Sequence, residues 1–384
     1  MRLTVIGAGP GGYVAALKAA QLGAAVTVVE TYEVGGTCLN WGCIPTKSLV
    51  SSAEAFHTVK RAGDFGIDLS GTAVPNMTKI MERKGKVVST MIKGIRSLFK
   101  SWGVTLIEGR GTLRSPREVT VARPDGSAET IGSDAVIIAT GSKPAALPLF
   151  PFDGDRILSS DDAVNLPALP KSIIMIGGGV IGCEFACIFQ ELGSDVSVIE
   201  ALPRILATED PAVSELMERE FKKRKISVFA SATVEKVTRS DEDVRVILAG
   251  GRELAAEKLL VSVGRTFNTD GIGADEIGIQ RGTKGEIRVN SRMETDVAGV
   301  YAVGDITGGM LLAHKASREG VVAAYNACGI PKEMRYDVIP AAIFTLPEIG
   351  SVGLREHLAA ERGIAVRTGN FQYRTLGKAH AMGE

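Results

Sequence analysis

Two continuous runs of apolar residues, residues 3–6 and residues 173–176, each lead into a glycine-rich turn. Runs of this length without alternation are typical of strands that are buried on both faces of a parallel sheet. Each turn is followed by a segment that we expect to be helical and then by a second apolar strand, residues 26–29 or residues 196–199. The repeated order of strand, turn, helix and strand predicts an α/β protein that contains two units of the same architecture.

The glycines of the two turns have the spacing of a dinucleotide-binding loop. The two sets are Gly7, Gly9 and Gly12 in the first unit and Gly177, Gly179 and Gly182 in the second. In such a loop the first glycine allows a tight turn, the second lets a pyrophosphate approach the backbone, and the third lets the helix pack closely on the strand. One loop of this kind predicts little, but two loops in the same context predict two bound dinucleotides rather than ordinary turns.

A glutamate ends the second strand of each unit, 23 residues after the first glycine of its loop: Glu30 and Glu200. A carboxylate at this place accepts hydrogen bonds from a ribose and repels the 2′-phosphate of NADP. Arg204 is nearby but lies four residues beyond Glu200. The second unit is therefore predicted to bind NAD.

The charge balance and the length exclude several classes of protein. Lysine plus arginine equals aspartate plus glutamate at 44 each, so there is no basic surface for nucleic acid and no acidic tail. No apolar run reaches the ~20 residues that a membrane helix needs, and the first strand begins too early for a signal peptide to precede it. We therefore expect two to three domains in the cytoplasm, where a lasting disulfide is more often catalytic than structural.

Cys38 and Cys43 stand in a context that predicts a redox-active dithiol. Five residues of regular helix rise about 7.5 Å, more than the ~7 Å that a disulfide tolerates between its Cα atoms. A bond between these cysteines would require a distorted backbone, which Gly42 permits. Pro45 suits the first turn of a resumed helix, and both that helix N-terminus and Lys47 would stabilise a thiolate. We interpret the pair as catalytic rather than as two buried cysteines or a structural disulfide.

Residues 35–47 closely resemble the redox-active disulfide signature of the pyridine nucleotide–disulfide oxidoreductases. Trp41 is the one unusual residue of the segment, because a smaller aliphatic side chain is expected there. Within the family, the segment is most similar to that of the members that oxidise dihydrolipoamide with NAD. The resemblance implies FAD and NAD as cofactors and two Rossmann-like dinucleotide-binding domains.

The resemblance also implies roles for four catalytic residues. A dihydrolipoamide thiolate would attack Cys38 of a Cys38–Cys43 disulfide and release Cys43 as a thiolate against the flavin. Glu184 matches the acidic partner of the motif lysine, so it would pair with Lys47 beside the flavin ring.

Further residues are assigned to the cofactors by the same resemblance. Those expected at FAD, besides the first glycine loop and Glu30, are Gly36, Thr37, Lys47, Gly111, Thr140, Gly141, Ser142, Asp305, Met310, Leu312 and Ala313. Those expected at NAD, besides the second loop and Glu200, are Ile181, Val234, Gly264 and Arg265. Asp305 would reach the ribityl chain of FAD, and the helix that begins near Leu312 would point its N-terminus at the flavin ring.

Family order and the positions of the prolines divide the chain into four expected parts. These are a FAD-binding domain with the redox disulfide (1–149), an NAD-binding domain (150–268), a central domain that completes the FAD site (269–338), and the beginning of an α+β interface domain (339–384). The interface domain implies a homodimer for the full-length protein. The expected partner is a lipoamide-bearing acyltransferase or a small dithiol substrate.

Family members continue through most of an interface domain that carries a His–Glu dyad, the acid–base of the substrate thiols, and no His-Pro-x-x-x-Glu sequence occurs here. We expect either a truncated product of a longer enzyme or a chain without that chemistry. A reductase of the mercuric or glutathione type stays an alternative, although the C-terminal cysteines of the first are absent and Glu200 disfavours the NADP of the second. The alternative from another class is a FAD- and NAD-binding electron carrier without dithiol turnover.

Other conspicuous residues are given structural roles. His314 stands at the start of an expected helix and is interpreted as structural rather than as a base, and none of the four histidines has the spacing of a metal site. Cys183 and Cys187 share a helix face and are expected to pack against the sheet rather than to be redox-active. Residues 75–102 predict a long helix with an apolar face of Ile80, Val87, Val88, Met91, Ile95 and Leu98.

Overall fold

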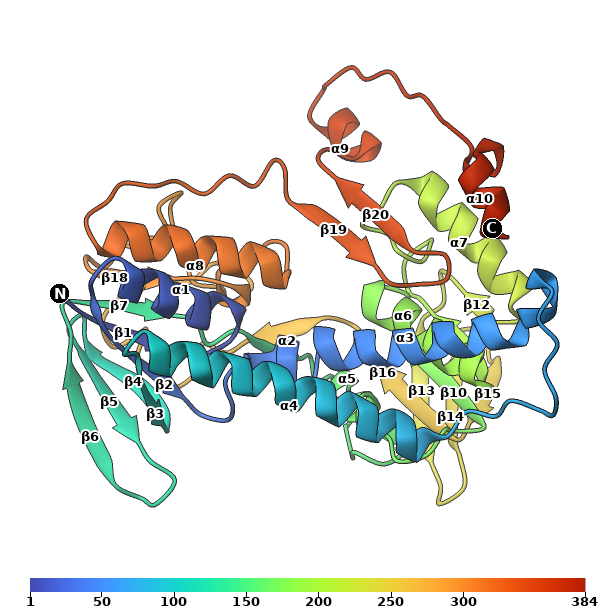
Figure 1. The fold of residues 1–384 in the computed structure, drawn as a ribbon, viewed down its shortest axis with the longest axis horizontal. Helices are drawn as coiled ribbons and strands as arrows, with labels where there is room; N and C mark the ends of the chain where they lie inside the picture. Colours follow the sequence, from blue (N-terminus) through green and yellow to red (C-terminus); the bar gives the residue numbers. More distant parts are fainter. Residues whose placement is uncertain (384) are drawn as a thin grey trace.

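The computed structural model describes residues 1–383 and contains a parallel five-stranded sheet in each half of the molecule (Figure 1). The first sheet consists of β18 (Val300–Ala302), β7 (Ala135–Ile138), β1 (Arg2–Ile6), β2 (Ala25–Glu30) and β3 (Thr105–Glu108), in that spatial order. In β1, Leu3 pairs with Val26 on one side and with Ala135 on the other. Helices α1 (Pro10–Gln21) and α8 (Ala313–Ala327) pack together on one face of this sheet.

The second sheet repeats the plan of the first. Its spatial order is β12 (Ser227–Phe229), β11 (Asp195–Ile199), β10 (Ser172–Ile176), β16 (Lys258–Val261) and β9 (Ile157–Leu158). Ile173 of β10 pairs with Val196 and with Lys258, and helices α6 (Val180–Leu192) and α7 (Pro211–Lys223) follow β10 and β11 along the chain. The apolar runs of β1 and β10 are buried, as expected of central strands. The predicted α/β fold with two Rossmann-like units is confirmed.

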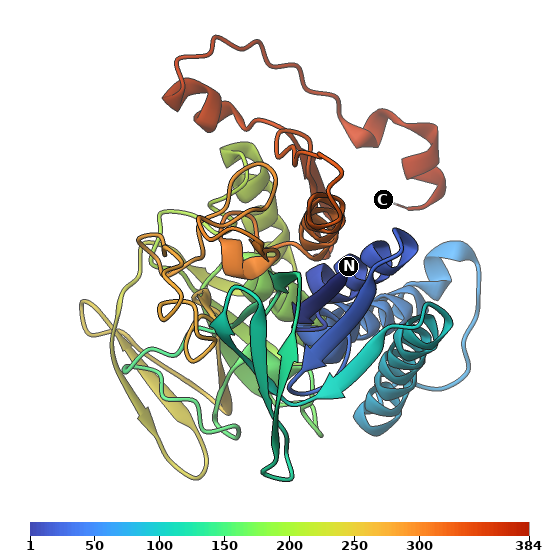
Figure 2. The same ribbon diagram turned by 90° about the vertical axis from the view of Figure 1, so that its left-hand side faces the viewer.

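Each unit also carries an antiparallel sheet of three strands. These strands are β4 (Arg110–Ser115), β5 (Glu118–Ala122) and β6 (Ala128–Gly132) in the first unit, and β13 (Val234–Arg239), β14 (Val244–Leu248) and β15 (Glu253–Ala256) in the second. Both antiparallel sheets lie on the side of the molecule opposite α8 and the C-terminal segment (Figure 2).

Three helices carry the chain past the redox segment: α2 (Gly36–Asn40), α3 (Cys43–Lys60) and α4 (Met77–Ser101), with the 3₁₀ turn η1 (Ala62–Phe65) after α3. The long helices α3 and α4 lie side by side and reach from the first unit to the second (Figure 1). The helix predicted over residues 75–102 is confirmed, and the Asn76 side chain caps it by accepting a hydrogen bond from Lys79 N–H at 3.1 Å.

The predicted apolar face of α4 is partly wrong. Met91 and Leu98 are 44% and 45% exposed, whereas Ile95 and Phe99 are buried in the core of the first unit. Only part of the apolar surface of α4 is therefore covered by the core. Nearer the N-terminus of α4, Lys84 is buried, and its Nζ donates to the Val164 carbonyl at 2.9 Å. Burial lowers the pKa of this lysine.

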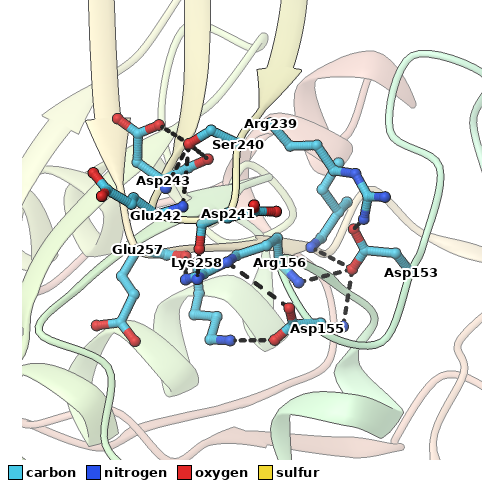
Figure 3. Close-up of polar contacts among 11 residues, drawn as sticks. Asp153, Asp155, Arg156, Arg239, Ser240, Asp241, Glu242, Asp243, Glu257 and Lys258 are labelled. Atoms are coloured by element: carbon cyan, nitrogen blue, oxygen red, sulfur yellow. Dashed lines mark hydrogen bonds and ion pairs between the residues drawn. The ribbon is translucent and has the colours of Figure 1, made fainter.

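The two chain crossings between the units pair with each other as β8 (Ser142–Pro144) and β17 (Arg265–Phe267). Beyond β8, a charged network fixes residues 153–158 on the second unit (Figure 3). Asp153 Oδ1 accepts from three backbone N–H groups, including that of Arg156 at 2.7 Å, and Arg239 pairs with the other oxygen. The helix α5 (Ser160–Ala163) follows this network. The domain boundaries near residues 150 and 268 stay predictions.

The C-terminal segment turns back over the second unit (Figure 1). It contains the hairpin β19 (Pro340–Ile343) and β20 (Ile349–Val352), then α9 (Glu356–Glu361), the 3₁₀ turn η3 (Tyr373–Thr375) and α10 (Gly377–Ala381). Arg355, just before α9, binds both carboxylate oxygens of Glu209 at 3.0 Å. Among residues 1–383, no helix has the length and apolar character of a membrane-crossing segment.

Candidate active site

The dithiol lies where α2 meets α3. Gly35 and Gly36 have φ values of 94° and 56°, which favour glycine, and they turn the chain into α2. Gly42 separates the two helices, and a side chain there would place its Cβ 2.8 Å from the Thr37 carbonyl oxygen. The structure therefore has the predicted break in the helix, and α3 begins at Cys43.

Cys38 and Cys43 are free thiols whose side chains lie close enough to shift each other's pKa, and the disulfide between them stays a prediction. The hydrogen bond from Cys38 and the charge of Lys47 lower the pKa of the Cys43 thiol to about 7, although burial opposes them. The same hydrogen bond, together with burial, raises the pKa of Cys38 well above its usual range. The thiolate of the pair is therefore on Cys43, at a helix N-terminus that also stabilises it.

Lys47 connects the dithiol helix to the second unit. Its Nζ lies 3.7 Å from Glu184 Oε1 on α6, the pairing that the resemblance implied. The backbone N–H of Phe344 donates to the same carboxylate oxygen at 2.9 Å, and Lys47 Nζ lies 4.1 Å from the centre of the Phe344 ring, within the range of a cation–π interaction. Burial raises the pKa of Glu184. Sequence reasoning missed Phe344, although its segment had been assigned to the interface domain.

The first glycine loop is shaped to receive a pyrophosphate. A Cβ at Gly7 would lie 2.4 Å from Ala139 O, and one at Gly12 would lie 1.9 Å from Gly7 O, so both positions require glycine. A Cβ at Gly9 would meet nothing nearer than 3.8 Å, which leaves room in front of α1. No side chain within residues 1–383 caps this helix end, so its amide groups are free to bind an anion. These residues fit the FAD that the first unit is expected to hold.

The second glycine loop is built in the same way. A Cβ at Gly177 would lie 2.6 Å from Ser262 O, and one at Gly182 would lie 2.0 Å from Gly177 O. Among the described residues, a Cβ at Gly179 would meet no atom within 4 Å, and no side chain caps α6. The space in front of α6 fits the phosphates of a second dinucleotide.

The two glutamates brace their own glycine loops. Glu30 Oε2 accepts the N–H of Ala8 at 2.6 Å, and Glu200 Oε2 accepts the N–H of Gly178 at 2.6 Å. The other oxygen of each accepts the N–H two residues further along the chain. These bonds add a structural role to the predicted role as ribose acceptors.

Arg204 is turned away from Glu200. Its guanidinium donates to the carbonyl oxygens of Ala207 and Glu209 and to Ser214 Oγ, at 2.8 to 3.0 Å. These bonds hold the side chain within its own loop, where it is not free to bind a 2′-phosphate. The geometry is consistent with the preference for NAD that the sequence indicated.

Three of the residues expected at the cofactors form one chain of hydrogen bonds. Ser142 Oγ donates to Asp305 Oδ2 at 2.6 Å and accepts from Arg265 Nε at 2.7 Å. Asp305 begins the 3₁₀ turn η2 (Asp305–Thr307), which is separated from β18 by Val303 and Gly304. Thr140, just before Ser142, donates its hydroxyl to the Asn268 carbonyl at 2.9 Å. Ser142 of β8 and Arg265 of β17 therefore connect both chain crossings to the turn that carries Asp305.

The other residues expected at the cofactors lie at several places. A Cβ at Gly36 would be 2.6 Å from Gly9 Cα, so this residue borders the first loop. Leu312 is the N-cap of α8 and Ala313 its first residue, as predicted. The rest are Thr37 in α2, Gly111 in β4, Gly141 before β8, Ile181 in α6, Val234 in β13, Gly264 before β17, and Met310 before α8. The roles of all these residues toward the cofactors stay predictions.

With this geometry in place, comparison with known proteins decides the family. The sequence pattern of the pyridine nucleotide-disulphide oxidoreductases matches residues 1–320, and that of the dimerisation domain of the same family matches residues 339–384. The chain belongs to the pyridine nucleotide-disulphide oxidoreductases.

Relatives in this family include dihydrolipoyl dehydrogenases. The chain is 44% identical to the one of Chlamydia muridarum, over 99% of this chain and 81% of the relative. It is 38% identical to one from Bacillus subtilis, over 99% of this chain and 83% of the relative. Among solved structures, LpdA from Mycobacterium tuberculosis matches with a TM-score of 0.93 at 31% identity, covering 100% of this chain and 84% of that one.

Membership of the pyridine nucleotide-disulphide oxidoreductases confirms the predicted class of enzyme, an oxidoreductase that uses FAD and NAD. The match of residues 339–384 to the dimerisation domain agrees with the interface segment expected there. The chain spans about four-fifths of the length of these relatives.

The contacts of His314 and the burial of Cys183 and Cys187 agree with the structural roles expected of these three residues. His314 Nε2 forms a 2.7 Å hydrogen bond with the Pro340 carbonyl, which ties α8 to β19. Cys183 and Cys187 are buried in the core of the second unit. Within residues 1–383, no group of histidine, cysteine and acidic residues is arranged to hold a metal ion.

Proposed function

We propose that this chain oxidises dihydrolipoamide with NAD⁺, through the Cys38–Cys43 pair and a bound FAD. The observation that supports this most is the state of the dithiol. Two cysteines from different helices are in hydrogen-bonding contact, and the pKa of Cys43 is lowered to about 7. A thiolate that is available at neutral pH suits rapid exchange between a dithiol and a disulfide.

The residues of the chain carry out the thiol chemistry. In the oxidised enzyme, one thiolate of dihydrolipoamide attacks Cys38 Sγ, and the Cys38–Cys43 bond breaks with its electron pair on Cys43. The second substrate thiolate then attacks the substrate sulfur of this mixed disulfide, which closes the lipoamide ring and releases Cys38. The two electrons of the substrate now reside on the Cys38–Cys43 dithiol. When bound, FAD accepts these electrons and returns them as hydride to NAD⁺.

The surroundings of Cys43 suit its role as the leaving thiolate. The ammonium of Lys47 and the hydrogen bond from Cys38 stabilise its negative charge, so it is the better leaving group of the two. Cys38, whose pKa is raised, is the sulfur that forms the bond to the substrate. The ion pair with Glu184 and the contact with the Phe344 ring together hold the Lys47 ammonium near Cys43.

The test is a steady-state assay of NAD⁺ reduction by dihydrolipoamide, with parallel assays of NADH oxidation by a dye. The proposal expects turnover of both substrates, and Cys38→Ser should lose the first activity by several orders of magnitude and keep the second. Dye reduction without dihydrolipoamide turnover by the unaltered chain would instead support an electron carrier. Glutathione disulfide or Hg²⁺ as the preferred oxidant would point to another reductase of the family.

The dimerisation segment supports a homodimer as the assembled form, and a lipoamide-bearing acyltransferase is the partner that would deliver the substrate. Sedimentation at several protein concentrations tests the first point. A pull-down with a lipoylated acyltransferase domain, against the unlipoylated domain as control, tests the second. The cytoplasmic location stays a prediction.

A further inference from the structure

A buried ion pair lies behind the turn that carries Asp305, and the thiol chemistry described above does not use it. Lys315 and Glu319 stand one turn apart on α8, with side chains that are 2% and 0% exposed. Lys315 Nζ lies 3.2 Å from Glu319 Oε1. Two buried charges are costly to desolvate unless all their hydrogen bonds are made, and a pair of apolar residues would often be at least as stable. The partners of the pair therefore indicate its role.

Both charged groups bind the backbone of Gly304. Glu319 Oε2 accepts the N–H of Gly304 at 2.8 Å, and Lys315 Nζ donates to the carbonyls of Gly304 at 3.3 Å and Gly308 at 3.0 Å. Gly304 has a φ of 85°, a conformation that other residues rarely adopt. The ion pair thus holds both ends of η2, the turn in which Asp305 is the first residue.

The same turn is fixed on its other side by the Asp305 side chain, which accepts from Ser142 Oγ at 2.6 Å. A group that binds a cofactor must be held within about 0.5 Å of its productive position by the residues behind it. Ser142 orients the carboxylate, while Lys315 and Glu319 fix the backbone from which it extends. Neither member of the ion pair is bonded to Asp305 itself.

The third partner of Glu319 comes from outside the first unit. The hydroxyl of Tyr336 donates to Glu319 Oε1 at 2.7 Å. Burial and the neighbouring carboxylate raise the pKa of Tyr336, so the hydroxyl stays a donor at neutral pH. Tyr336 belongs to residues 328–339, the segment that runs from α8 to β19 of the dimerisation domain (Figure 1).

We infer that Lys315, Glu319 and Tyr336 are positioning residues of the flavin site. The ion pair fixes the backbone of Gly304 so that Asp305 meets the cofactor, and Tyr336 makes FAD binding depend on how the segment leading to the dimerisation domain is seated. This inference rests on the FAD site proposed above. The competing explanation is that the pair only stabilises the packing of α8.

The first experiment compares Tyr336→Phe with Tyr325→Phe, measuring the Kd of FAD by titration of the apoprotein. Tyr325 is a matched control on α8: its ring contacts Lys332, and its hydroxyl makes no hydrogen bond within residues 1–383. Loss of a hydrogen bond to a buried carboxylate should weaken FAD binding about fivefold or more in Tyr336→Phe. The Kd of Tyr325→Phe should stay within about twofold of the parent value.

The second experiment removes the pair without leaving an unpaired charge. In the double variant Lys315→Met/Glu319→Leu both charges are gone, so no unpaired charge is buried. The Gly304 N–H and the Tyr336 hydroxyl lose their acceptor, so the protein should fold with a lower Tm than the parent. FAD binding should still weaken about tenfold or more, and the amides of residues 304–308 should exchange faster in the apoprotein. The variant Lys315→Met/Glu319→Gln keeps an acceptor for the Gly304 N–H and should recover part of the affinity.

A double variant that folds and binds FAD with the Kd of the parent would overturn the inference, because α8 packing would then be the only role of the pair. If the double variant does not fold, the Tyr336→Phe variant is the deciding test. A Kd for FAD equal to that of the parent would then overturn the inference. If the unaltered apoprotein binds no FAD, the proposed flavin site fails instead, and amide exchange at residues 304–308 still reports whether the pair holds the turn.

Discussion

The ammonium of Lys47 lies 4.1 Å from the centre of the Phe344 ring, so a residue of the dimerisation segment contacts the lysine that stabilises the Cys43 thiolate. The Phe344 backbone also binds Glu184, the ionic partner of Lys47. A single residue of the C-terminal segment therefore limits the positions that both charged groups can take. The electrostatic environment of the dithiol depends on the seating of this segment.

Lys47→Met should raise the pKa of Cys43 above 7, because it removes a positive charge that lowers it. A rise of about one unit would cut the thiolate fraction at pH 7 roughly fivefold. Alkylation of the reduced apoprotein by iodoacetamide, followed from pH 5 to pH 9, would measure this shift. Phe344→Leu should give a smaller shift in the same direction, and Lys86→Met, on the exposed surface of α4, should give none. A midpoint in Lys47→Met that matches the parent would contradict the assignment.

The two sulfurs should differ when FAD is bound. A thiolate next to oxidised flavin gives a long-wavelength absorbance band, which Cys38→Ser should show without any reductant and Cys43→Ser should lack. The serine hydroxyl can still donate to Cys43, so the band should be present above about pH 7 and should disappear as the pH falls through that value. Opposite behaviour of the two variants would exchange the roles of the sulfurs.

Two glycines of the second loop, Gly179 and Gly182, should respond differently to one added methyl group. Gly182→Ala places Cβ 2.0 Å from the Gly177 carbonyl and should destabilise the protein by about 1–3 kcal/mol or more, seen as a lower Tm. Gly179→Ala meets no atom, so its Tm should not change, but NADH should bind about tenfold or more weakly because the methyl occupies the approach of the phosphates. Gly85→Ala, exposed on α4, is the control for the substitution itself. Unaltered NADH affinity in Gly179→Ala would argue against this loop as the phosphate site.

NADH should reduce the protein faster than NADPH, and Glu200→Gln should narrow the difference. Glutamine removes the charge that repels a 2′-phosphate but keeps an acceptor for the Gly178 N–H, so the loop stays braced. Stopped-flow reduction with each nucleotide at equal concentration would measure the ratio. Glu30→Gln, the matching change in the first unit, should leave the ratio as it is. A preference for NADPH in the unaltered protein would refute the assignment of Glu200.

The features predicted well from the sequence are those whose signals lie close together in the chain. Each glycine loop and its glutamate span fewer than 25 residues, and the helix break between Cys38 and Cys43 follows from Gly42 and Pro45 alone. The pairing of Lys47 with Glu184 joins residues far apart in sequence, and it was reached only through the family resemblance.

The features that were missed depend on packing between distant elements. Nothing near Phe344 in the sequence marks it as a neighbour of Lys47. The sequence of α8 also does not show that Lys315 is buried against the turn after β18. The apolar periodicity of α4 predicted a helix correctly, but it could not show how much of the apolar surface is covered. Met91 and Leu98 remain exposed for that reason.

The pairing of β8 with β17 means that the two nucleotide units are joined by one ribbon rather than by two independent tethers. Arg265 opens the returning strand, so any rotation of the second unit about this hinge carries its guanidinium along. That guanidinium is bonded to Ser142, and Ser142 is bonded to Asp305. The orientation of one unit is therefore transmitted to the flavin-side carboxylate of the other through two hydrogen bonds.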